Sequence, residues 1–125
     1  MLKAVDCIND TFKMALYSDA YASTQIDGAA PAYSTTNEIV ATNYTAGGAT
    51  LGSKTVTQDD TNDRAAWDAA DVTWTSLATA TIQRAILYDD TTATKWHAII
   101  WEIGTNSNGG NYTLQFNANG MMLLS

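Results

Sequence analysis

The sequence predicts an all-β protein, an antiparallel β-sandwich with a short N-terminal helix. Several short runs of Thr, Val, Ile and aromatic residues are separated by turn signals at short intervals, a pattern typical of a sandwich or barrel. No helix-length segment lies between the later runs, which argues against a parallel α/β fold. The composition agrees, because 19 threonines stand against two glutamates, and Thr suits extended, half-exposed positions. A jelly roll is one form of sandwich that fits this pattern.

With 125 residues, the chain is expected to form one domain. Within the single domain 1–125, we expect residues 1–18 to form an N-terminal helical arm and residues 36–125 to form the β-sandwich body. A domain of this size hides roughly two-thirds of its unfolded surface and can fold without disulfides. Its one cysteine, Cys7, cannot form an internal disulfide and fits a reducing cytoplasm.

The N-terminal helix is expected in the stretch AVDCINDTFKMALYS, residues 4–18. Its two aspartates suit the positive end of a helix dipole. Such a helix would pack as a lid on the body or on a neighbouring subunit. Apolar residues recur in it at helical spacing: Val5, Ile8, Phe12, Ala15 and Leu16.

The middle of the chain predicts a loop, then a turn followed by extended chain, and then a connection. Residues 19–36 have the composition of a loop and hold the only proline. Gly47-Gly48 signals a turn, and the KTVT stretch that follows it indicates extended chain. The next stretch, QDDTNDRAAWDAADVTW at residues 58–74, is acidic and rich in alanine, and we interpret it as a connection.

The second half predicts a hairpin and a closing segment. Residues 81–104 indicate two strands around the turn DDTTAT, with apolar residues on both faces. Arg84 and Glu102 are expected to face each other across this hairpin, where a partly buried ion pair would fix the register. A strand is expected at Tyr112–Asn117, followed by a turn at Asn119-Gly120. The apolar stretch Met121–Leu124 then pairs as a closing strand or buries against another chain.

Catalytic and metal-binding patterns are weak. His97 is the only histidine, and without a nucleophile motif such as G-x-S-x-G we favour a structural role for it. A small hydrolase using His97 and Glu102 ranks last among the alternatives. The acidic run Asp59–Asp63 lacks the glycine of an EF-hand loop, so a solvated turn is favoured and an adventitious cation is left open. The glycine-rich run Gly104–Asn111 lacks the Lys-Ser/Thr ending of a phosphate loop. We predict no catalytic residue, cofactor or metal.

The net charge of −7 rests on only six basic residues. Binding to nucleic acid needs clustered Lys and Arg, so no nucleic-acid partner is expected. Acidity also repels anionic membranes, and no apolar run approaches the length of a membrane span.

Four stretches resemble small virion structural proteins of tailed bacteriophages. They are NYTAGGATL, DVTWTSLATATIQRAILYDD, AIIWEIG and NGGNYTLQFNANGMMLL, and together they cover most of Thr36 to Leu124. The shared features are a tyrosine–Gly-Gly turn, a V-x-W strand leading into a long apolar strand, and an NG-x-[FY]-T-[IVL]-Q-F-like strand before an apolar C-terminus. The chain departs from the pattern at Gln83-Arg84 and in the bulk of Trp96 and His97.

The resemblance implies a non-enzymatic protein of the virion, assembled in the cytoplasm of a host bacterium. It implies a capsid decoration (cement) protein that binds the major capsid protein across joints between coat subunits, often as a homotrimer. A neck, tail or fibre component is the first alternative, and a host-surface carbohydrate-binding module that uses exposed tryptophans is the second. Apolar residues in excess of what a small sandwich hides make a subunit interface plausible. The expected contact residues are Phe12, Leu16, Met121, Met122, Leu123 and Leu124.

Overall fold

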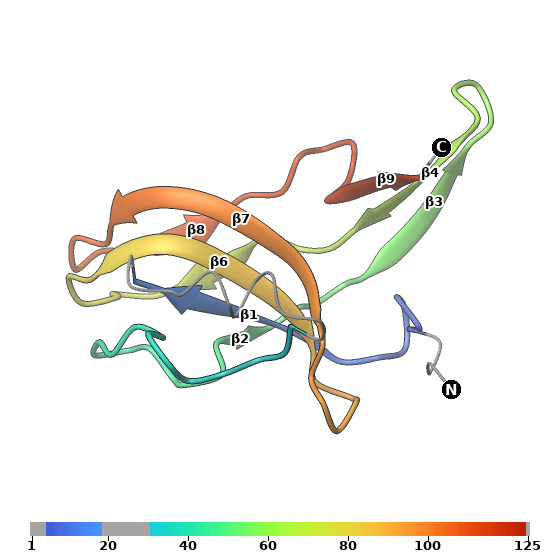
Figure 1. Cartoon of the computed structure of the whole chain (residues 1–125). Coiled ribbons are helices and arrows are strands. Elements are labelled where there is room, and N and C mark those ends of the chain that lie inside the picture. Colours follow the sequence, from blue (N-terminus) through green and yellow to red (C-terminus); the bar gives the residue numbers. More distant parts are fainter. Residues whose placement is uncertain (1–4, 19–30, 125) are drawn as a thin grey trace.

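The protein is all-β in the residues that the computed structural model describes, 5–18 and 31–124, and every strand pair is antiparallel (Figure 1). A four-stranded sheet has the order β2-β1-β6-β7, a three-stranded sheet β3-β4-β9 and a two-stranded sheet β5-β8. The described residues hold no helix that could cross a membrane. The strands are β1 (Phe12–Tyr17), β2 (Ala49–Thr50), β3 (Thr55–Asp59), β4 (Arg64–Asp68), β5 (Val72–Trp74), β6 (Thr81–Asp89), β7 (His97–Asn106), β8 (Tyr112–Leu114) and β9 (Met122–Leu124).

The N-terminal helix predicted for residues 1–18 is wrong. Residues 12–17 form β1, an inner strand between β2 and β6. Periodicity alone cannot separate a short apolar run in a helix from a strand buried on both faces, and here the strand is buried on both. Phe12, Met14 and Leu16 enter one apolar cluster, and Ala15 and Tyr17 enter another. Residues 1–4 of the predicted arm lie outside the described residues.

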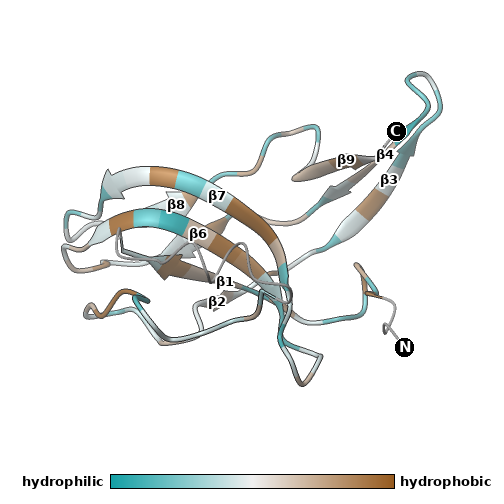
Figure 2. Cartoon of the chain, viewed as in Figure 1, coloured by the Kyte–Doolittle hydropathy of each residue, from teal (hydrophilic) through white to brown (hydrophobic). Residues whose placement is uncertain are grey.

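The main core lies between the four-stranded sheet and the β5-β8 pair, in the manner of a sandwich (Figure 1). Buried side chains from both layers meet there, and residues of the intervening loops close the core. Brown, apolar positions of β6 and β7 are visible along the ribbon in Figure 2. The buried members of this core are Phe12, Met14, Leu16, Ile39, Leu51, Trp67, Val72, Trp74, Leu77, Ile82, Ala85 and Leu87.

The predicted hairpin of residues 81–104 is confirmed as β6 and β7. β7 forms an outer edge of the four-stranded sheet, and its pairing with β6 shifts between Ile82 and Arg84 and again between Leu87 and Tyr88. Gly104, near the first shift, has a φ of 65°, a left-handed conformation that suits glycine at a bulge. Such irregularities disfavour the pairing of another strand with a sheet edge.

The stretch interpreted as a connection, residues 58–74, instead holds the end of β3, all of β4 and all of β5. Alanine and aspartate are poor strand formers by propensity, so β4 could not be predicted from its residues alone. Pairing on both sides overrides that propensity, because β4 lies between β3 and β9. The closing strand predicted at Met121–Leu124 is present as β9.

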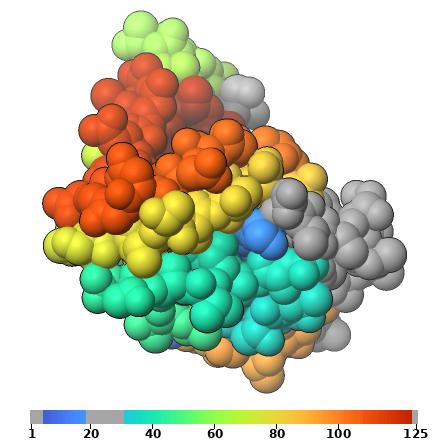
Figure 3. Space-filling view, turned by 90° about the vertical axis from the view of Figure 1, so that its left-hand side faces the viewer, coloured from blue at the N-terminus to red at the C-terminus, as the bar shows by residue number. Residues whose placement is uncertain are grey.

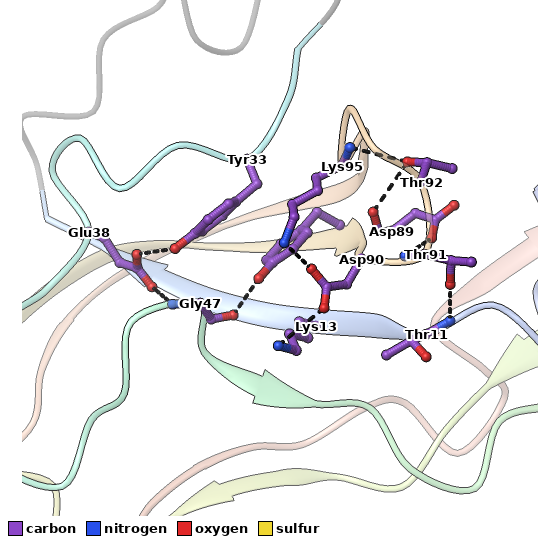
Figure 4. Close-up of polar contacts among 11 residues, drawn as sticks. Thr11, Lys13, Tyr33, Glu38, Gly47, Asp89, Asp90, Thr91, Thr92 and Lys95 are labelled. Atoms are coloured by element: carbon purple, nitrogen blue, oxygen red, sulfur yellow. Dashed lines mark hydrogen bonds and ion pairs between the residues drawn. The ribbon is translucent and has the colours of Figure 1, made fainter.

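Residues 31–48, called here the cover, wrap around the side of β1. Residues 37–39 hydrogen-bond to the end of β1, Ile39 and Tyr44 pack against the main core, and Tyr33 packs on the second face of the four-stranded sheet. Glu38 fixes this cover from a buried position. Its carboxylate accepts hydrogen bonds from the Tyr33 hydroxyl at 2.8 Å and the Gly47 amide at 2.7 Å (Figure 4). It also accepts one from the Tyr44 hydroxyl at 2.6 Å. Three donors offset the cost of burying a carboxylate.

Tyrosine rings fill the space beneath this cover. Tyr33 stacks on Tyr88 with a centroid separation of 4.4 Å, and the Tyr88 hydroxyl donates to the Gly47 carbonyl at 2.8 Å. Beside them, Asp90 forms ion pairs with Lys13 and Lys95 (Figure 4). The cover is thus tied to β1 and β6 by polar bonds as well as by ring contacts.

Replacing Gly48 by alanine should destabilise the protein strongly. Its φ is 77°, and an added Cβ would lie 1.8 Å from the Met14 carbonyl oxygen, so β1 would have to move. We expect a loss of at least about 2 kcal/mol in the free energy of unfolding, measured by urea denaturation. Gly52→Ala is the matched control, because nothing lies within 4 Å of its added Cβ. Equal stability of the two variants would contradict this account of the turn.

Alkaline pH should unfold the protein through its tyrosines. Burial, and for Tyr33 and Tyr44 the bond to Glu38, raise the pKa of Tyr33, Tyr44 and Tyr88 well above the ordinary value of 10.0. A raised pKa in the folded state leaves stability unchanged below about pH 10 and lowers it as the pH rises further. Tyrosinate absorbance should therefore rise for these side chains together with loss of tertiary structure. Ionisation of all tyrosines in a fully folded protein would refute this.

Candidate interaction surface: the projecting sheet

The three-stranded sheet β3-β4-β9 projects from the body of the protein and is called here the projecting sheet. Its hairpin tip stands apart from the rest of the chain in Figure 1, and in Figure 3 the light green tip and the red C-terminal segment rise above the turquoise and yellow body. β4 is its central strand, so β3 and β9 each have only one neighbour among the described residues. The sheet therefore presents two outer edges.

A hydrogen-bonded turn forms the tip of the projecting sheet. The Asp59 carboxylate accepts from the Asn62 side chain at 2.8 Å and from Arg64 Nε at 3.0 Å. The bond from Asn62, followed by the one from Arg64, lowers the pKa of Asp59. Asp63 has a φ of 48°, which aspartate tolerates in turns. Among the described residues no cluster of His, Cys, Asp and Glu is arranged to hold a metal ion.

Trp67 anchors the projecting sheet to the body. Its side chain is only 3% exposed and meets the Phe12 ring edge-on, with centroids 5.0 Å apart. The indole Nε1 donates to the Cys7 carbonyl at 3.1 Å. A tryptophan on β4 is thereby fixed to the chain that leads into β1.

The C-terminal segment joins the sheet at the same tryptophan. The Met121 amide donates to the Trp67 carbonyl at 2.7 Å, and Met122 then pairs with Trp67 in the register of β4 and β9. The turn before it needs Gly120, because its φ is 108° and an added Cβ would lie 3.1 Å from both the Ala66 Cβ and the Trp67 carbonyl oxygen.

Two large apolar side chains of the projecting sheet are exposed: Val56 by 52% and Leu123 by 46%. Val56 pairs with Trp67, and Leu123 pairs with Ala66, the preceding residue of β4. Successive residues of a strand point to opposite faces, so the two apolar side chains lie on opposite faces of the sheet. The sheet can therefore offer apolar contacts on either side.

The residues predicted as contacts fall into two groups. Phe12 and Leu16 have no exposed surface, because both belong to the chain's own core, so they cannot reach a partner in this structure. Met121 and Met122 are half-buried. Leu123 is exposed, and Leu124 pairs with Ala65 in β9.

The charged residues of the hairpin lie apart from the projecting sheet. Arg84 pairs with Glu102 in the β6–β7 register, and Arg84 Nε lies 2.7 Å from Glu102 Oε1. His97 begins β7, five positions and roughly 16 Å of extended strand from Glu102. Burial lowers the pKa of His97. The structure does not bring His97 and Glu102 together.

A small apolar groove of about 240 Å³ lies between β7 and the chain after β8. Trp101 and Phe116 line it, with ring centroids 5.9 Å apart. Of the other tryptophans, Trp67 and Trp74 are buried in the core and Trp96 is half-buried. Sequence reasoning placed Trp101 on a strand but gave no sign of this pairing, since Phe116 is distant in the chain.

Comparison with known proteins identifies no relative: no family model, no curated protein and no solved structure matches the chain.

Removing the Trp67 side chain should destabilise the whole protein, because a buried anchor and its hydrogen bond are both lost. We expect Trp67→Ala to lower the free energy of unfolding by about 3–5 kcal/mol, measured by urea denaturation. The matched control is Leu123→Ala on the same sheet, expected to cost less than about 1 kcal/mol because the side chain is half-exposed. A Trp67→Ala variant as stable as this control would show that the projecting sheet is held by other contacts.

Proposed function

We propose that the chain is a structural protein of a tailed-bacteriophage virion, and specifically a capsid decoration protein that binds across joints between coat subunits. The observation that carries the proposal is the projecting sheet, with two open edges and exposed apolar residues on both faces. Open edges and apolar side chains are the means by which extended elements bind other proteins. The assignment to a bacteriophage virion rests on the four stretches that resemble virion proteins.

Binding of this kind needs no reaction centre. A decoration protein gains affinity when many copies, each with a modest contact, engage a repetitive shell. The exposed Val56 and Leu123 would supply apolar contacts, and the acidic surface of a chain with net charge −7 would favour basic or neutral patches on the coat protein. The partner proposed is therefore the major capsid protein.

The same projecting sheet would serve a neck, tail or fibre component equally well. The two roles differ in copy number, because a shell offers hundreds of equivalent positions and a neck or tail roughly a dozen. The groove beside Trp101 and Phe116 favours a third role, a carbohydrate-binding module, since aromatic rings form platforms for sugars. That role uses a surface distinct from the projecting sheet.

A double variant, Val56→Ser with Leu123→Ser, should fold normally but lose at least tenfold in its binding to assembled capsids, measured by co-sedimentation. The matched control is Val40→Ser, which alters a side chain that is 97% exposed and lies outside the projecting sheet. Subunit counting in intact particles then separates a shell position from a neck or tail position.

The outcomes of this experiment are distinct. Binding by the double variant equal to that of the control would contradict a role for the projecting sheet. Absence of the chain from particles, together with quenching of tryptophan fluorescence by oligosaccharides, would favour the carbohydrate-binding module instead.

A further inference from the structure

We infer that the open edge of β3 pairs with β3 of a second copy of this chain, in an antiparallel arrangement centred on Thr57. The inference concerns the isolated protein and does not rest on a role in the virion. Each projecting sheet would continue into the other, so that the two copies share one sheet.

β3 is the least protected edge among the described strands. Its five residues pair with β4 without a shift of register, and the strand contains no proline or lysine. Thr and Val are favourable strand residues. The outer edge strand β7, in contrast, carries two register shifts. The other edge strands are shorter: β2 has two residues, and β5, β8 and β9 have three each. Natural proteins protect long regular edges, so an edge like β3 indicates a partner strand.

Two-fold symmetry restricts the possible registers. An antiparallel pair of identical strands is related by an axis perpendicular to the sheet, which keeps each side chain on its own face. The axis must therefore pass beside one residue, which faces its own copy. Only the register centred on Thr57, the middle of β3, pairs all five residues of both strands.

The charges favour the same register. Centred on Thr57, the pairing places Lys54, just before β3, opposite Asp60, just after it. Symmetry repeats this opposite-charge pair at the other end of the strand. Asp59 then faces Thr55, whereas a register centred on Asp59 would oppose two like charges, which destabilises a pair of strands. Full overlap and charge complementarity, two independent properties, thus select one arrangement.

The projecting sheet extends away from the body (Figures 1 and 3), and antiparallel pairing puts the two bodies at opposite ends of the shared sheet. The tip of each hairpin would then lie beside Lys54, at the base of the other. The contact is two-fold, so the trimer expected from the resemblance would need a different surface.

Cysteine cross-linking tests both the pairing and its register. In a Cys7→Ser background, Thr57→Cys should form a disulfide-linked dimer under mild oxidation, because facing Cα atoms of antiparallel strands lie about 4.5–5.5 Å apart, within disulfide reach. Thr55→Cys is the matched control on the same edge: its two copies would lie about 14 Å apart along the strands and should form no disulfide. Both positions are exposed, so both variants should fold.

Charge exchange provides a second test in solution. Sedimentation equilibrium should show a dimer that Lys54→Glu weakens by roughly fivefold or more. Lys54→Glu combined with Asp60→Lys should restore association, because the exchanged charges attract again. Lys54 also interacts with Asp6, so a loss caused by that contact would persist in the double variant.

The results divide clearly. Cross-linking at position 57 alone, with rescue by charge exchange, supports the inference. A monomer at all concentrations with no cross-link, equal cross-linking at 55 and 57, or failure of the exchange to rescue would each overturn it. A dimer in a protein absent from particles would contradict the proposed function and leave this inference intact, and a monomeric decoration protein would do the reverse.

Discussion

Burial of β1 on both faces is the constraint on which the rest of the structure depends. A strand with no exposed apolar surface needs a layer on each side. One side is supplied by the main core, in which Phe12 meets Trp67. On the other side, Ala15 and Tyr17 pack with Ile86 and Tyr88 of β6. Tyr33 stacks on Tyr88 there and donates its hydroxyl hydrogen bond to Glu38. The turn at Gly48 can approach β1 closely only because glycine lacks a side chain there.

The same constraint explains which elements of the fold can be predicted from the sequence. The β6–β7 hairpin was predicted because a long apolar run, a polar turn and a second apolar run lie in order along the chain. β1 was mistaken for a helix because its fully buried run has no alternation with a period of two. β4 was missed since Ala65 and Ala66 carry little strand signal and are held by partners far away in the sequence. Phe12 and Leu16 lost their predicted contact role as soon as the helix became an inner strand.

The candidate site was less predictable than the fold. The sequence indicated the apolar segment 121–124 but not the sheet that it completes, because β9 depends on β4. The exposed Val56 looked like an ordinary strand residue, and only the pairing order shows that its strand is an outer edge. Local patterns specify elements, whereas an edge is a property of the assembled sheet. The same holds for the groove at Trp101 and Phe116, which forms between distant segments.

The base and the tip of the projecting sheet are stabilised by different contacts. Trp67 couples the base to the core, whereas the turn between β3 and β4 is stabilised mainly by its own bonds, from Asn62 and Arg64 to Asp59. Lengthening a surface loop costs little beyond closure entropy, so the tip is a natural position for grafting a foreign epitope while the core stays intact. If two copies pair through β3, each graft would be displayed next to the body of the opposite copy.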